Sequence, residues 1–90
     1  MAILIDTPRW PNHGTLWSHL LSDSSLAELH EFAHRNGVPE RAFDLDHYDV
    51  PQRSHDDLVA AGARPVSNRE LVERLRDSGL RITAAERRRR

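Results

Sequence analysis

The sequence predicts a small single-domain α/β protein with a short, mostly parallel three-stranded sheet and about three helices. Two kinds of segment alternate along the chain. Apolar or alternating segments are typical of strands, and amphipathic segments that begin at helix-capping residues are typical of helices. The chain has only 90 residues, of which 38% are hydrophobic, and this suffices for one thin core. We therefore expect one domain over residues 1–82 and a disordered, Arg-rich tail over residues 83–90.

The N-terminal segment is expected to contain one buried strand and a long loop. Residues 2–5 form a continuous apolar run, typical of a buried parallel strand, which ends at Asp6. Two prolines and a glycine in residues 7–14 indicate a loop, and residues 15–21 are expected to form one or two helical turns. The loop would leave the carboxyl end of the strand, where ligand sites form in parallel sheets.

Three helices are predicted over residues 25–37, 54–62 and 67–79, because each of these segments starts at a serine and ends at a glycine. The first and third begin with a capping box, in which a serine precedes a glutamate by three positions. Between the second and third helices, residues 64–66 form a minimal strand. This order of strands and helices favours parallel crossovers.

A further strand is expected near residues 43–48, where side chains alternate in character. Continued alternation places His47 and Asp49 on one face, since residues two apart on a strand share a face. Asp44 and Asp46 are then expected on the opposite face, as solvated or helix-facing charges. His47 and Asp49 can orient one another or bind one ion together.

Composition limits the classes of site and partner. The absence of cysteine excludes disulfides and thiolate ligands, so that a metal would need His and carboxylate ligands. The start of the chain has no basic region and too short an apolar run for a signal peptide or a membrane span, and a cytoplasmic protein is expected. All 13 basic residues are arginines, and the four at Arg87–Arg90 are a candidate contact for a protein or nucleic-acid partner. A homo-oligomer is a further alternative.

Histidines dominate the candidate site. Five of the six histidines lie between positions 13 and 47. If the strand ends converge as the fold predicts, their imidazoles meet the carboxylates of Asp6 and Asp49 and can bind Zn, Mn or Mg. The candidate metal ligands are Asp6, His19, His30 and His47, and the candidate catalytic residues are His47, Asp49 and His19. The same groups can perform general acid and base chemistry without a metal.

Residues 30–34 match the H-E-x-x-H motif of zinc peptidases. A zinc peptidase also needs a third ligand on another element and a substrate cleft, which 90 residues hardly supply. We therefore interpret His34 as a solvated residue beside Glu31. His30 lies next to apolar positions of the same helix and is expected to border the core, as a structural histidine or as a ligand.

Several short motifs resemble those of a small bacterial and phage family known only as a domain of unknown function. The resemblance covers roughly residues 2–70 and is carried by the motifs S-H-L, E-L-H and H-Y-D, together with single residues between them. It implies no activity. The positions that match the family pattern are Asp6, His19, Asp23, His30, His47 and Asp49, whereas Glu31 and His34 fall outside it.

Two functions follow as hypotheses from different classes. In the first, a polar His/Asp pocket binds a divalent ion and supports hydrolysis of a phosphoester, with His47 or His19 as ligand or base and Asp49 as the orienting group. In the second, the protein is a non-catalytic interaction module in which the His/Asp set is a structural hydrogen-bond network. Catalysis predicts imidazoles and carboxylates that are close together and reached by solvent, whereas the module predicts buried pairs and an exposed patch elsewhere.

Overall fold

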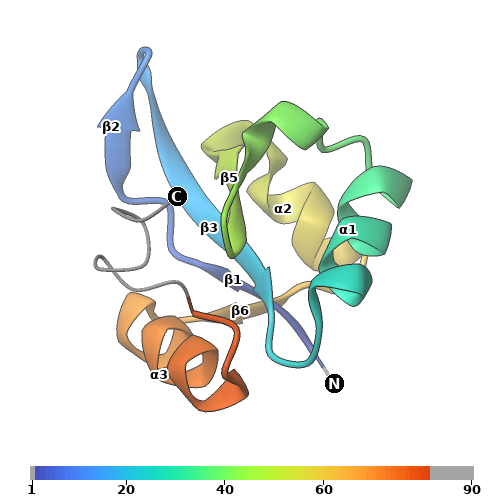
Figure 1. Ribbon diagram of the computed structural model, residues 1–90. Coiled ribbons are helices and arrows are strands. Elements are labelled where there is room, and N and C mark those ends of the chain that lie inside the picture. Colours follow the sequence, from blue (N-terminus) through green and yellow to red (C-terminus); the bar gives the residue numbers. More distant parts are fainter. Residues whose placement is uncertain (1, 82–90) are drawn as a thin grey trace.

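A mixed sheet of six strands separates two layers of helices in the computed structural model, which describes residues 2–81 (Figure 1). The strand order is β4-β5-β3-β1-β6, and β2 pairs with β3. In chain order the elements are β1 (Ile3–Asp6), β2 (Trp10–Asn12), β3 (Thr15–Ser22), α1 (Leu26–Arg35), a 3-10 turn η1 (Glu40–Ala42), β4 (Phe43–Asp44), β5 (His47–Pro51), α2 (Gln52–Ala60), β6 (Arg64–Val66) and α3 (Asn68–Ser78).

The prediction of a small α/β domain with three helices is confirmed, but the predicted short, mostly parallel sheet of three strands is wrong, because the sheet has six strands and is mixed. Only β1 and β6 pair in parallel, and the other pairs are antiparallel. The cause is a reversal at His13 and Gly14, whose φ angles of 48° and 77° suit a two-residue hairpin turn. Residues 10–22 therefore form the hairpin of β2 and β3, where a loop and helical turns were expected. Pro11 is tolerated in β2 because this strand lies off the main path of the sheet, and Pro8 precedes the strand.

The two faces of the sheet bury different cores. Because side chains alternate along a strand, Ile3 and Ile5 of β1 face α1 and α2, whereas Leu4 faces α3. The first core also contains Leu20, Leu29, Phe32, Tyr48, Val50 and Leu58, and the second contains Leu21, Leu71 and Leu75. The α3 side is the smaller core and leaves part of its face uncovered, along β3 and β5.

Helix positions follow the capping residues for α1 and α3. The hydroxyl of Ser25 accepts the amide of Glu28 at 3.1 Å, and that of Ser67 accepts the amide of Glu70 at 3.0 Å. Gly79 ends α3 in the left-handed conformation that glycine adopts without strain. The expected start of α2 at Ser54 is wrong, because the helix begins at Gln52 directly after β5, with Pro51 as its N-cap.

The expected strand over residues 43–48 is a tight hairpin instead. The chain reverses at Leu45, whose φ of 60° is unusual for a branched residue, and the amide of Asp46 donates to the carbonyl of Asp44. The reversal changes the alternation, so that Asp44 lies opposite His47 in the ladder and shares its face. Asp46, which was expected to be solvated, is buried in the turn.

Residue 1 and residues 82–90 lie outside the described part of the chain. The predicted disordered tail, its contact residues Arg87–Arg90 and the domain boundary at residue 82 therefore stay predictions. Within residues 2–81, no helix has the length and apolar character needed to cross a bilayer.

Candidate metal centre

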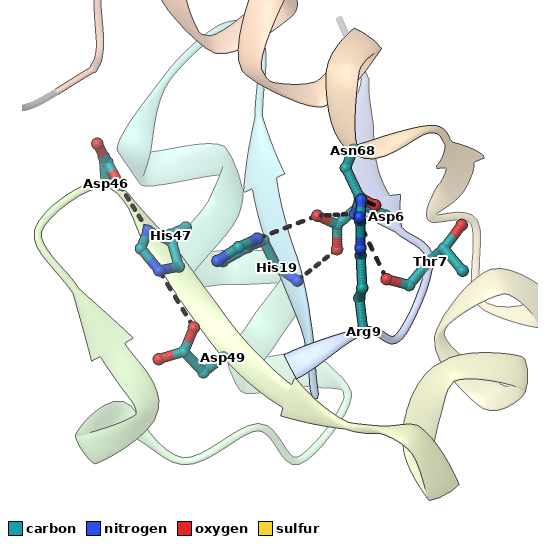
Figure 2. A network of polar contacts seen from close by, with 8 residues as sticks. All are labelled: Asp6, Thr7, Arg9, His19, Asp46, His47, Asp49 and Asn68. Carbon is teal, nitrogen blue, oxygen red and sulfur yellow. Dashed lines mark hydrogen bonds and ion pairs between the residues drawn. The ribbon is translucent and has the colours of Figure 1, made fainter. Parts of the chain in front are cut away.

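A polar row crosses the uncovered part of the α3 face. Asp6 ends β1, His19 lies in the middle of β3, and Asp49 pairs with His19 from β5. His47 lies two residues before Asp49 and therefore on the same face. The strand register thus brings together residues from three segments that are far apart in the sequence. Figure 2 shows them with their polar neighbours.

Asp6 fixes the position of His19. Its carboxylate accepts the backbone amide of His19 at 2.6 Å and faces the ring Nδ1 at 3.0 Å. It also accepts the side-chain amide of Asn68, at the start of α3, at 2.8 Å. Asp6 is only 1% exposed, and these three bonds compensate for the burial of its charge. Because an ionised carboxylate can only accept, Nδ1 of His19 carries the proton and a neutral ring keeps its lone pair on Nε2.

His47 lies between two carboxylates. Its Nδ1 is 2.6 Å from Asp46, and its Nε2 is 3.1 Å from Asp49. Burial lowers the pKa of His47, but the hydrogen bonds and charges of Asp46 and Asp49 outweigh this effect and raise it to about 9. At neutral pH the ring is therefore an imidazolium ion that donates to both aspartates, and a metal ion that binds Nε2 would have to displace the proton there.

His19 and His47 meet edge to face, with ring centroids 4.7 Å apart. One ligand atom from each of His19, His47 and Asp49 lies within 4.8 Å of the others. Small movements of these side chains would bring all three atoms to bonding distance from one shared ion. Figure 2 shows the His19 ring extending from Asp6 toward His47. Each imidazole is thus supported from behind by a buried aspartate, an arrangement typical of histidines that bind metals.

A cavity of 460 Å³ opens above this group. Exposure rises across the three side chains, from 12% for His47 and 27% for His19 to 47% for Asp49, so that solvent reaches all of them. Trp10 of β2 is 41% exposed and packs edge-on against His19, with centroids 4.0 Å apart. The complete lining is Trp10, Asn12, His13, Trp17, His19, Asp44, His47 and Asp49.

His30 is not part of this group. It lies on α1, across the sheet, where its Nδ1 is 2.6 Å from the hydroxyl of Tyr48. Burial, together with the charge of Glu40, raises the pKa of Tyr48, whose hydroxyl shares this hydrogen bond with His30. Tyr48 alternates with His47 and Asp49 along β5 and therefore points to the opposite face. The proposed ligand set of Asp6, His19, His30 and His47 is thus divided: His30 is remote, and Asp6 acts through His19.

The H-E-x-x-H match does not build a second metal group. Glu31 forms an ion pair with Arg35 at 3.4 Å, and His34 is exposed. Among residues 2–81, the set of histidines and carboxylates close enough to hold one ion contains His19, His47 and Asp49 alone. These positions agree with the interpretation of His34 as a solvated residue.

The chain was compared with known protein families, curated proteins and solved structures. Residues 3–78 match the model of a family described as "Protein of unknown function (DUF4031)". The chain belongs to this family. The expected resemblance to a domain of unknown function is thereby confirmed. Neither the curated proteins nor the solved structures contain a significant match to this DUF4031 domain.

Three residues that support the site of this DUF4031 domain escaped sequence reasoning. Asp46 was placed on the wrong face because the turn at Leu45 was missed. Asn68 was treated only as part of a helix cap, although it also binds Asp6. Trp10 was expected on a loop and lies on a strand beside His19. Gly14 follows His13 in a two-residue turn, and a glycine in such a turn is a hairpin signal that could have located Trp10.

Proposed function

We propose that the protein is a divalent-metal-dependent hydrolase that acts on phosphoesters, with the ion bound by His19, His47 and Asp49. The observation that carries this proposal is the close approach of two imidazoles and one carboxylate in a solvent-reached cavity, each imidazole being oriented by a buried aspartate. A metal site needs ligand atoms that approach one another, and the histidines that bind metals are commonly oriented by a carboxylate at the other ring nitrogen.

The ligand types favour Zn or Mn over Mg. Imidazole nitrogen suits borderline metals, and Mg prefers oxygen ligands and retains its water. Three protein ligands leave coordination positions open, as in catalytic zinc sites. When bound, the ion supplies Lewis-acid polarisation of a phosphoryl oxygen and of water.

The protein's residues have separate roles in such a reaction. Asp6 and Asp46 keep the two imidazoles in fixed orientations, while the half-exposed Asp49 closes the site on the solvent side. A water oxygen forms a bond to phosphorus, the ester P–O bond breaks, and the leaving alcohol takes up a proton. The products are an alcohol and a phosphate with one fewer ester bond.

Hydrolysis of bis(p-nitrophenyl) phosphate with added Zn or Mn tests the proposal. The wild-type protein is expected to release p-nitrophenol, and Asp49→Asn and His19→Ala should each lower the rate at least tenfold. His30→Ala is the matched control, because His30 lies on the other face of the sheet and should keep the rate. Metal binding without any hydrolysis of phosphoesters would reject catalysis and retain the ion site.

The interaction module remains a second candidate because one observation favours it. Asp6, His19 and Asn68 join β1, β3 and α3 through mutually satisfied, partly buried bonds, as a structural network would. If this is their whole role, removing His47 should leave metal content unchanged, and neither Zn nor Mn should raise the unfolding temperature.

A further inference from the structure

A second hollow lies next to the metal centre. It has a volume of 660 Å³ and is bounded by residues 36–39, 41 and 42, the end of β5 and the first turns of α2. Trp17 and Asp49 line both this hollow and the cavity over the histidines. We call it the α2 groove. A molecule that reaches the ion at Asp49 can therefore extend directly into the α2 groove.

Two arginines line the α2 groove. Arg41 comes from η1, and Arg53 lies in the first turn of α2. Three other helical arginines form ion pairs with a glutamate one turn away, in the pairs Arg35–Glu31, Arg69–Glu73 and Arg74–Glu70. Within residues 2–81, neither Arg41 nor Arg53 forms an ion pair, even though Asp57 lies one turn after Arg53.

The chemistry of this lining suits an anion. A guanidinium group presents paired N–H donors that match the oxygens of a phosphate, and exposed arginines without a carboxylate partner keep those donors available. Two carboxylates, Asp49 and Asp57, also line the α2 groove, and Asp49 is 3.1 Å from Nε2 of His47. Pro51 also leaves the first turn of α2 without a side-chain cap, which adds to the local preference for negative charge.

We propose that the substrate carries a second phosphate group, which Arg41 and Arg53 bind in the α2 groove while the scissile phosphoester lies at His19, His47 and Asp49. This inference rests on the proposed function, because it names the substrate class for the same site. Neither arginine lines the cavity over the histidines, so the phosphate that they bind is distinct from the scissile one. The second phosphate can belong to a nucleoside diphosphate or to the next linkage of an oligonucleotide.

The test separates phosphate binding from metal chemistry. Isothermal titration of the full chain in EDTA measures affinity for orthophosphate, thymidine diphosphate and a 5′-phosphorylated dithymidine. The variants are Arg41→Gln/Arg53→Gln and, as a matched control, Arg64→Gln/Arg76→Gln, which removes two exposed arginines outside the α2 groove. All four positions are exposed, so the fold should persist, and circular dichroism verifies this.

The groove variant should bind the two ligands that carry a second phosphate about tenfold more weakly than the wild-type protein does, while the control variant keeps the wild-type affinity. A stronger loss for the dinucleotide than for the diphosphate identifies the oligonucleotide as the source of the second phosphate. Equal affinities of the groove variant and the control would overturn the inference. Because EDTA removes the ion, this failure is distinct from a failure of hydrolysis, which the assay with bis(p-nitrophenyl) phosphate reports.

Discussion

The rings of His19 and His47 meet edge to face across neighbouring strands, and each is held on its far side by a buried aspartate. Asp6 binds His19 from β1, and Asp46 binds His47 from the turn before β5. The two histidines thus gain their orientation from the sheet itself, before any ion is bound. This pre-organisation is what a metal site on a thin domain needs, because little other structure is present to position its ligands.

Asp6 is expected to control metal affinity without contacting the ion. Asp6→Asn keeps the size of the side chain but removes the charge that fixes the tautomer of His19. We expect the affinity for Zn or Mn to fall about 10- to 100-fold, as for other second partners of metal-binding histidines. Competition with a chromophoric chelator measures this change. An unchanged affinity would show that Asp6 has only a structural role.

Ser22 is expected to be the more important serine at the start of α1. Its hydroxyl donates to Glu28 at 2.7 Å and accepts the amides of Ser24 and Ser25. Ser22→Ala removes the partner of these partly buried bonds, and we expect a loss of about 1–3 kcal/mol in the free energy of unfolding. Urea unfolding measures it, with Ser24→Ala as the exposed control. Equal effects of the two substitutions would contradict this assignment.

Acid should weaken the fold through Asp23. Burial raises the pKa of Asp23, but the amide of Ala2, the guanidinium of Arg74 and the hydroxyl of Ser24 outweigh this effect and lower it from 3.8 to about 2. The unfolded chain therefore binds this proton first as the pH falls. The stability that Asp23 contributes is complete above about pH 4 and is lost toward pH 2.

Urea unfolding between pH 5 and pH 2 measures this contribution. Asp23→Asn should lower stability at pH 5 and flatten the dependence on pH relative to the wild-type protein. Parallel curves for the two proteins would show that Asp23 does not titrate in this way.

A substitution at Leu4 should lower the stability of the fold without changing the affinity of the site for metal. Leu4 is fully buried beneath α3, in the smaller of the two cores. Leu4→Ala is expected to cost about 2–5 kcal/mol of unfolding free energy, because a cavity replaces packed side-chain atoms. Below the unfolding temperature, the metal affinity should stay within about twofold of the wild-type value. A large loss of affinity in the folded variant would indicate that α3 packing also shapes the site.

Local capping chemistry was readable from the sequence, whereas strand direction was not. Ser25, Ser67 and Gly79 act within a few residues of their partners, so their patterns predicted α1 and α3. The sheet was misread because two reversals, at His13 and Leu45, place non-glycine residues at positive φ. The residue types at these two positions do not reveal a turn. Each missed turn changed the predicted direction of the next strand or the face of the sheet on which its side chains lie.

Only part of the candidate site was predicted, because strand direction could not be derived from the sequence. His47 and Asp49 share a face through simple alternation, and this relation survives the hairpin. The approach of His19 depends on β3 returning beside β1, which the sequence did not indicate. His30 was grouped with these residues because the sequence does not show which face of the sheet its helix covers. Only the paired register of three strands decides which histidines meet.

Isothermal titration calorimetry of the metal-free protein with Zn directly tests whether His19, His47 and Asp49 bind a metal ion. We expect one ion per chain and loss of binding in His47→Ala. His34→Ala, which removes an exposed histidine outside the cluster, should bind Zn as the wild-type protein does. Binding that survives His47→Ala, or no binding of Zn or Mn by the wild-type protein, would contradict the proposed metal site.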